Sequence, residues 1–104
     1  MHWLNLMLYF FGGAFVANSL PHLSNGISGR SFQSPFAKPP GKGLSSPVVN
    51  VVWGFSNLAA AYLLIYPRGS FDLRNGPDVL ALGAGFLITS VLTALTFGRF
   101  NAAR

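Results

Sequence analysis

Three stretches of the chain are almost continuously apolar, and every charged residue lies outside them. The stretches are Met1–Gly29, Leu44–Pro67 and Val79–Gly98. Each contains an apolar run of about 20 residues, which at about 1.5 Å per residue is enough to cross a hydrocarbon core of about 30 Å. A charge near the bilayer centre would cost about 2.5 kcal/mol or more, so their exclusion has a physical cause. We therefore expect an all-α integral membrane protein, with one membrane domain over residues 1–104 and three transmembrane helices.

Local signals set the expected ends of these helices. The predicted spans are residues 3–20, 47–66 and 79–97. Pro21 is expected to kink or end the first helix, because proline lacks a backbone N–H. Ser46 is a suitable N-cap for the second helix, and Pro47 suits its first turn. Pro77 or Asp78 is expected to open the third helix after a turn.

A long connection, residues 21–46, separates the first two predicted helices. It is rich in Gly, Pro and Ser, as flexible linkers are, yet apolar residues recur along it. They are Leu23, Ile27, Phe32, Phe36 and Leu44. A loop of this length is usually functional or disordered, and irregular backbone is tolerated at membrane depth only against protein or water. We expect it to lie at the membrane interface, packed on the protein's own helices or on a partner.

The few charges are mostly basic, and their distribution predicts an orientation. Charged residues make up 9% of the chain and the net charge is +5. Five basic residues fall on the side of the long loop and the C-terminus: Arg30, Lys38, Lys42, Arg99 and Arg104. Arg68 and Arg74 fall on the other side. The positive-inside rule then places the N-terminus outside, and the long loop and C-terminus in the cytoplasm, of a multi-pass protein of the bacterial inner (plasma) membrane. Membrane lipids are expected partners and nucleic acid is not, because no basic face carries interleaved aromatic residues.

Small and polar residues recur at helical spacing within the spans, which is typical of helix–helix contacts in membranes. The predicted helix-contact residues are Gly13, Ala17, Asn18, Asn50, Gly54, Asn57, Gly85 and Thr89. The asparagines would each contribute roughly 0.6–2 kcal/mol through interhelical hydrogen bonds. Alternatively, they could line a polar path for an ion or solute.

His22 is the main candidate for cofactor chemistry. It lies one turn after Asn18 and could ligate a metal, haem or chlorophyll magnesium, or carry a proton. The alternative is a histidine at a helix end that bonds backbone or lipid phosphate. The chain has no cysteine, and its two aspartates are expected on the opposite side of the membrane from His22, so the spacing predicts no metal site.

A second candidate is an anion or lipid-headgroup site at Lys42, Ser45 and Ser46, close to a predicted helix N-terminus. The phosphate-loop pattern is not met, because Gly43 stands where Ser or Thr is required. A simple turn with a solvated lysine is the alternative. No serine has a partnered base in a recognisable motif, so no catalytic residue is predicted and an enzyme is not expected.

These features lead to three functional hypotheses. The first is a small non-catalytic subunit or assembly partner of a larger bacterial membrane complex, respiratory or photosynthetic, which contacts neighbouring subunits through the small-residue faces and the loop of residues 21–46. The second is a homo-oligomeric channel or small-solute carrier lined by the Asn and Thr stripes. The third is a membrane protein that binds lipid, haem or pigment through His22. In layout the chain resembles small bacterial inner-membrane proteins of three or four helices, and this resemblance carries no site residues.

Overall fold

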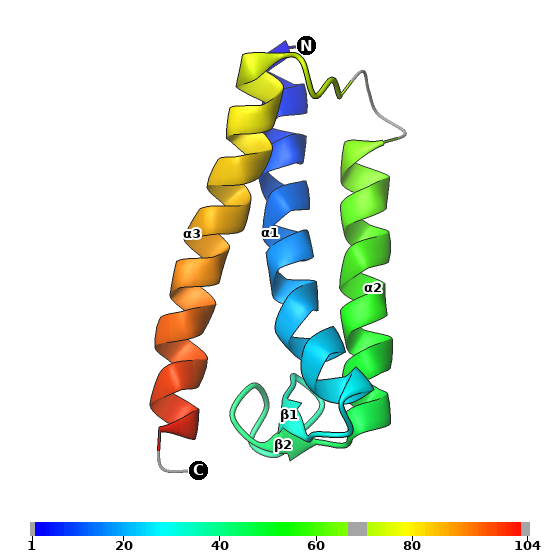
Figure 1. Cartoon of the computed structure of the whole chain (residues 1–104), viewed down its shortest axis with the longest axis vertical. Coiled ribbons are helices and arrows are strands. Elements are labelled where there is room, and N and C mark those ends of the chain that lie inside the picture. Colours follow the sequence, from blue (N-terminus) through cyan, green and yellow to red (C-terminus); the bar gives the residue numbers. More distant parts are fainter. Residues whose placement is uncertain (1, 67–70, 103–104) are drawn as a thin grey trace.

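The computed structural model describes residues 2–66 and 71–102, which form three long helices and a small hairpin (Figure 1). The elements in chain order are α1 (His2–Ile27), β1 (Phe32–Gln33), β2 (Leu44–Ser45), α2 (Pro47–Ile65) and α3 (Gly76–Asn101). All three helices are long and apolar enough to cross a membrane. The prediction of a mostly helical chain with three helices of membrane-spanning length is therefore confirmed.

Helix α1 is the centre of the fold. It packs along α2 on one side and along α3 on the other, whereas α2 and α3 scarcely touch each other (Figure 1). The molecule measures 43 × 23 × 21 Å, so its long axis matches the roughly 40–45 Å of a bilayer with its headgroups. The buried residues of the helices therefore lie mainly along the two seams with α1, further buried residues lie in the hairpin, and the outer faces of α2 and α3 are apolar and exposed.

The prediction that the first helix ends near Leu20 is wrong, because α1 continues through Pro21 to Ile27. Its last turns bend toward α2 (Figure 1), as expected where a proline removes one helical hydrogen bond. The actual end is a Schellman motif: the Arg30 N–H donates to Asn25 O over 2.8 Å, and the Gly29 N–H to Gly26 O over 3.0 Å. Gly29 has a φ of +77°, which the motif requires.

The other two helices begin where their capping residues lie. The Ser46 side chain accepts a hydrogen bond from the Val49 N–H over 3.2 Å, so the predicted N-cap of α2 is confirmed. Helix α3 extends beyond the predicted residues 79–97 at both ends. At its start, the Asn75 side chain accepts from the Asp78 N–H over 3.1 Å. The prediction was too short because it followed the apolar run, and helical backbone bonds continue into polar sequence.

The rest of the predicted loop is an ordered hairpin beneath the helices. Strands β1 and β2 pair antiparallel, with Phe32 opposite Ser45 and Gln33 opposite Leu44. Ser34 organises the turn: its carbonyl accepts from the Gly41 N–H over 2.7 Å, and its hydroxyl lies 2.5 Å from that of Ser45. As expected, the hairpin packs on the protein's own helices.

Candidate functional site

The seam between α1 and α2 is formed by one polar and small-residue face of α2. Its buried residues are Asn50, Gly54, Asn57 and Ala61, whose spacing places them on one side of the helix. A Cβ on Gly54 would lie 2.9 Å from the backbone nitrogen of Leu23, so the helices approach closely there. Three of the predicted helix-contact residues therefore face α1 of the same chain.

Asn50 and His22 link α2 to the end of α1. His22 Nδ1 lies 2.7 Å from Asn50 Oδ1. The Asn50 amide nitrogen faces the carbonyl oxygens of Phe32 at 3.1 Å, Ser46 at 3.1 Å and Ser45 at 3.3 Å. Because these acceptors fix the nitrogen on their side, the amide oxygen faces His22, and Nδ1 of His22 is the donor. The pair joins α1, the hairpin and α2 at one point.

The surroundings of His22 bear on its predicted role as a haem or pigment ligand. The residue is 2% exposed. The rings of Phe32, Trp53 and Phe97 lie edge-on around it, with centroid distances of 5.5, 6.4 and 6.2 Å. A planar macrocycle requires an open approach to the ring nitrogen opposite Nδ1, whereas His22 is almost fully enclosed and has aromatic rings on several sides. The arrangement is that of a buried structural histidine.

Within residues 2–66 and 71–102, no three His, Cys, Asp or Glu side chains gather closely enough to hold a metal ion. Asp78 is buried at the opposite end of the molecule from His22, where its Oδ2 accepts from the Asp72 N–H over 3.1 Å.

Asn18 and Asn57 form a second bridge between α1 and α2, nearer the middle of the helices. The Asn18 amide nitrogen donates to Asn57 Oδ1 over 3.0 Å, and the Asn57 amide nitrogen donates to the carbonyl of Trp53 over 2.8 Å. The Asn18 Oδ1 atom has no hydrogen bond to any residue that the structure describes. It is also not enclosed, since every buried side-chain oxygen and nitrogen in the described part has a partner.

This asparagine pair lies in an open groove over α1, between α2 and α3, which we call the central groove. The groove has a volume of about 250 Å³ and is lined by Phe11, Ala14, Phe15, Asn18, Asn57 and Thr89. Thr89 is half-buried, and its hydroxyl, like Asn18 Oδ1, bonds to none of the described residues. The groove thus combines apolar walls with two oxygen atoms, Asn18 Oδ1 and the Thr89 hydroxyl, that can each accept a further hydrogen bond.

The seam between α1 and α3 depends on glycine. A Cβ on Gly85 would overlap the carbonyl oxygen of Phe10, and one on Gly13 would overlap that of Leu82. The two backbones are therefore in direct contact at these points. Ala17, also predicted as a contact residue, is buried on α1 beside α3.

The predicted anion site is not assembled as a unit. The Ser45 hydroxyl bonds that of Ser34, and the Ser46 hydroxyl caps α2. Lys42 Nζ lies 5.6 Å from the centroid of the Phe100 ring on α3, which is a cation–π distance. Both hydroxyls are thus engaged within the chain, and the lysine ammonium lies over a ring of α3.

Several residues that shape the fold were missed by the sequence analysis. Gln33 is fully buried and exchanges two hydrogen bonds with Asn101, of 2.7 and 3.2 Å, which fasten the hairpin to the end of α3. Tyr9 is buried against Phe71, with ring centroids 5.0 Å apart. Sequence offers no local signal for pairs so far apart. The signal for Gly26 was available, because small residues at helical spacing continue beyond Pro21.

Taken together, these contacts make a scaffold with an open groove, and they place no nucleophile beside a base among the described side chains. The polar residues of the two seams hold the helices in register. The central groove is where side chains with unused hydrogen-bonding capacity meet an accessible apolar surface. Comparison of the chain with protein-family models, with curated proteins and with solved structures finds no match.

Proposed function

We propose that this chain crosses the bacterial inner membrane three times and is a non-catalytic subunit, or assembly partner, of a larger membrane complex. In this proposal the central groove receives a transmembrane helix of a neighbouring subunit. Respiratory and photosynthetic complexes are the hosts we consider first, because they contain many small helical subunits of this kind.

The observation that carries the proposal is the pair of unsatisfied polar atoms in the groove. Thr89 lies at the middle of α3, and Asn18 also lies well inside its helix. In hydrocarbon, a polar group without a partner is unfavourable, and lipid tails offer none. A neighbouring helix with a Ser, Thr, Asn or backbone donor would satisfy Asn18 Oδ1, with a gain of about 0.6–2 kcal/mol per hydrogen bond.

The surface available to a partner differs from the one expected from the sequence. The faces Gly13/Ala17 and Gly54/Asn50 are occupied by the chain's own helices, so they are not free for another subunit. Among the surfaces still accessible, the central groove is the one that combines apolar walls with polar atoms that have no partner among the described residues, and its floor is the exposed side of α1. Its walls include Phe11 and Phe15, which are 50% and 37% exposed.

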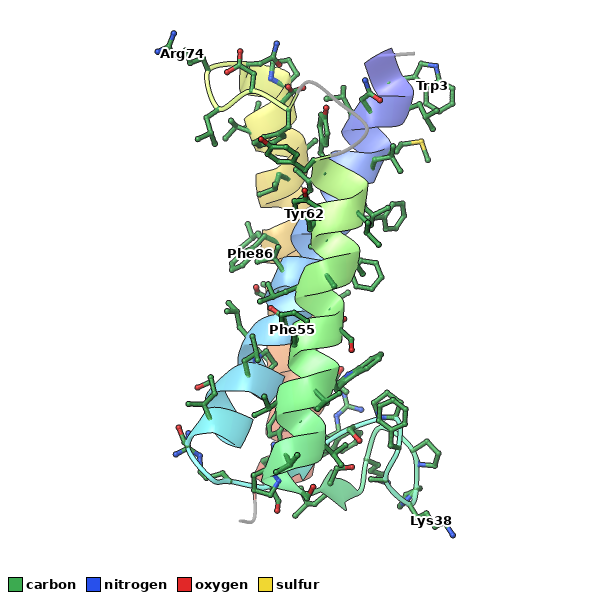
Figure 2. All side chains as sticks on the ribbon, turned by 90° about the vertical axis from the view of Figure 1, so that its right-hand side faces the viewer. Trp3, Lys38, Phe55, Tyr62, Arg74 and Phe86 are labelled. Atoms are coloured by element: carbon green, nitrogen blue, oxygen red, sulfur yellow. The ribbon has the colours of Figure 1, made fainter. Side chains whose placement is uncertain are left out.

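The ends of the molecule support placement across a bilayer. Figure 2 shows Lys38 at the hairpin end, Trp3 and Arg74 at the other, and Phe55 and Phe86 along the middle. Basic residues are more frequent at the hairpin end, so we place that end in the cytoplasm. Trp3, 58% exposed, would then lie at the outer interface.

The two alternative functions have less support. A solute path lined by asparagines would need their amides free, and those of Asn50 and Asn57 are bonded within the chain. Binding of haem or pigment at His22 would require the surrounding aromatic rings to move. We therefore keep the homo-oligomeric channel and the cofactor carrier as outcomes of the experiment below.

The experiment is gentle extraction from the native membrane, followed by a native gel, mass spectrometry of the band and an absorbance spectrum. We expect the chain to migrate with a larger complex. Ala14→Leu fills the floor of the groove and should release the chain from it. Ala59→Leu is the matched control, because Ala59 is exposed on α2 outside the groove and should change nothing.

Three results would contradict the proposal. One is migration of the unaltered chain as a monomer. Another is migration as a small homo-oligomer, which would favour the channel or carrier. The third is equal behaviour of Ala14→Leu and Ala59→Leu, because the groove would then have no part in the association.

A further inference from the structure

A second hollow lies at the hairpin end, on the outer side of α2, and we call it the hairpin hollow. It has a volume of about 350 Å³ and is lined by Phe36, Val48, Val49, Val52, Trp53 and Ser56. Phe36 projects from the hairpin turn and meets Trp53 edge-on, with ring centroids 5.3 Å apart. The hollow is therefore formed by both the hairpin and the first turns of α2.

The lining of this hollow suits a hydrocarbon chain. Val48, Val52 and Phe36 are 72%, 60% and 65% exposed, so a large apolar surface is accessible. The single hydroxyl in the lining, that of Ser56, donates to the Val52 carbonyl over 2.8 Å and is thereby satisfied within its own helix. Apart from the indole N–H of Trp53, the hollow accordingly lacks the unused polar groups that distinguish the central groove.

The described charged residues at the hairpin end of the molecule are all basic. Arg30, Lys38 and Lys42 lie in or beside the hairpin, and Arg99 lies in the last turn of α3 at the same end. The first acidic residue in the sequence is Asp72, whose Oδ1 accepts from the Arg74 N–H over 2.8 Å, and Arg74 lies at the opposite end of the molecule (Figure 2). A ligand with an acyl chain and a negative headgroup would match both the hollow and its surroundings.

Hydrogen bonds within the hairpin fix the positions of Phe36 and Lys38. The Phe36 N–H donates to the Ser34 hydroxyl over 3.1 Å, and the Ala37 N–H donates to the Ser34 carbonyl over 3.3 Å. Ala37 is buried, so Phe36 and the exposed Lys38 flank an anchored residue. The aromatic ring of Phe36 and the ammonium group of Lys38 thus belong to residues two positions apart in a hydrogen-bonded turn.

Trp53 adds a hydrogen-bond donor between the apolar lining of the hollow and the basic hairpin. Its indole N–H makes no hydrogen bond to the residues that the structure describes. Long side chains on a helix lean toward its N-terminus, and the contact with Phe36 shows that this ring reaches back toward the hairpin. An interfacial tryptophan in this position can donate to the ester or phosphate oxygens of a lipid.

From these observations we propose that the hairpin hollow binds an anionic phospholipid. One acyl chain lies against Val48, Val52 and Trp53, and the phosphate is held by Lys38. The proposal rests on the membrane placement given above, but not on a partner complex. The isolated chain in vesicles therefore suffices to test it, and a failed subunit proposal would leave the result unaffected.

The experiment uses the chain's own fluorescence. The sequence has two tryptophans, and Trp3 is at the far end, so Trp3→Phe leaves Trp53 as the only reporter. This protein is placed in phosphatidylcholine vesicles that contain a small fraction of lipid with brominated acyl chains, which quench a tryptophan on contact. Brominated phosphatidylglycerol and brominated phosphatidylcholine are compared at equal mole fraction.

We expect phosphatidylglycerol to be preferred about fivefold, since one nearby cation contributes about 1 kcal/mol toward an anionic lipid. Lys38→Ala should reduce this preference to near parity, whereas Arg74→Ala, at the opposite end, should leave it intact. Val52→Phe narrows the hollow and should weaken quenching by both lipids. Added inorganic phosphate at millimolar concentration should displace neither.

Each of the following results would overturn the proposal. Equal quenching by the two lipids would show that no anionic headgroup is selected. An equal loss in Lys38→Ala and Arg74→Ala would show that the preference does not arise at the hairpin. Displacement by inorganic phosphate alone would indicate a headgroup site without an acyl chain in the hollow, and absence of quenching by either lipid would place no lipid there.

Discussion

Substitution of Gly85 by alanine is the sharpest test of the seam between α1 and α3. The added Cβ would lie 2.7 Å from the Phe10 carbonyl carbon and nearer still to its oxygen, whereas real Cβ atoms essentially never approach within 3.0 Å. Both neighbouring atoms belong to backbone, so a side-chain rotation cannot relieve the overlap. The two helices must separate.

The expected magnitude follows from a comparison within α3. Overpacking of a close contact costs about 1–3 kcal/mol, while alanine gains about 1 kcal/mol over glycine in helix propensity. Gly83→Ala is the matched control, because its Cβ would meet nothing within 4 Å. The propensity gain is common to both variants and cancels in the difference. Gly85→Ala should therefore be about 1–3 kcal/mol less stable than Gly83→Ala.

The assay measures the separation of α1 and α3 directly. Since the chain has no cysteine, one cysteine introduced at an exposed position of each helix can carry a donor and an acceptor dye. Energy transfer is then followed during titration with a denaturing detergent. Gly85→Ala should lose transfer at a lower detergent fraction than Gly83→Ala. Coincident curves would refute the close backbone contact from which the magnitude was derived.

Three further substitutions test the other parts of the scaffold by thermal unfolding in mild detergent. Asn50→Leu should destabilise by about 1–3 kcal/mol, because it removes the acceptor of the buried His22 N–H and leaves hairpin carbonyls unpaired. Gly29→Ala should cost about 1–2 kcal/mol through its positive φ, with no steric part because nothing lies within 4 Å. Ser46→Ala should cost about 1 kcal/mol, since the Val49 N–H loses its cap.

Each of these has a control on the same chain. Ser56→Ala removes a hydroxyl that bonds only within its own helix at an exposed position, and should have little effect beside Ser46→Ala. Gly83→Ala serves again beside Gly29→Ala, because neither added Cβ meets an atom within 4 Å; Gly83 lacks the positive φ and, inside α3, also gains helix propensity, so Gly83→Ala should not destabilise. For Asn50, a double-mutant cycle with His22→Phe should show coupling of about 0.5–3 kcal/mol. Strict additivity would mean that the two side chains do not act as a pair.

The sequence was sufficient to predict that three long helices form and where α2 begins, because the exclusion of charge and the cap at Ser46 act locally. The end of α1 was predicted at Pro21, because proline commonly ends a helix. The helix instead ends before Gly29, which has a left-handed backbone conformation. The Ser28–Gly29 pair at the true end is a turn signal that the sequence contains. Which of two competing local signals prevails depends on packing, here the contact of Gly26 with the start of α2.

For the central groove, the sequence predicted which residues take part but not how they are bonded. Asn18, Asn57 and Thr89 were all predicted as helix-contact residues, and they do lie together on one groove. The sequence could not show that Asn57 would be bonded by its neighbour while Thr89 remained open, because that depends on how far apart α2 and α3 stand. The bond between Gln33 and Asn101 joins residues 68 positions apart and is likewise a product of the fold alone.

The two seams along α1 differ in chemistry, and this has a consequence for how the chain comes apart. One seam is held by the side-chain amides of α2, while the other rests mainly on glycine contacts with α3, and the outer helices do not support each other. Loss of α3 would break the bonds between Gln33 and Asn101 but leave the side-chain bonds between α1 and α2 in place. We therefore expect denaturation in two steps rather than one cooperative transition, with a long-lived helical hairpin of α1 and α2 as the intermediate.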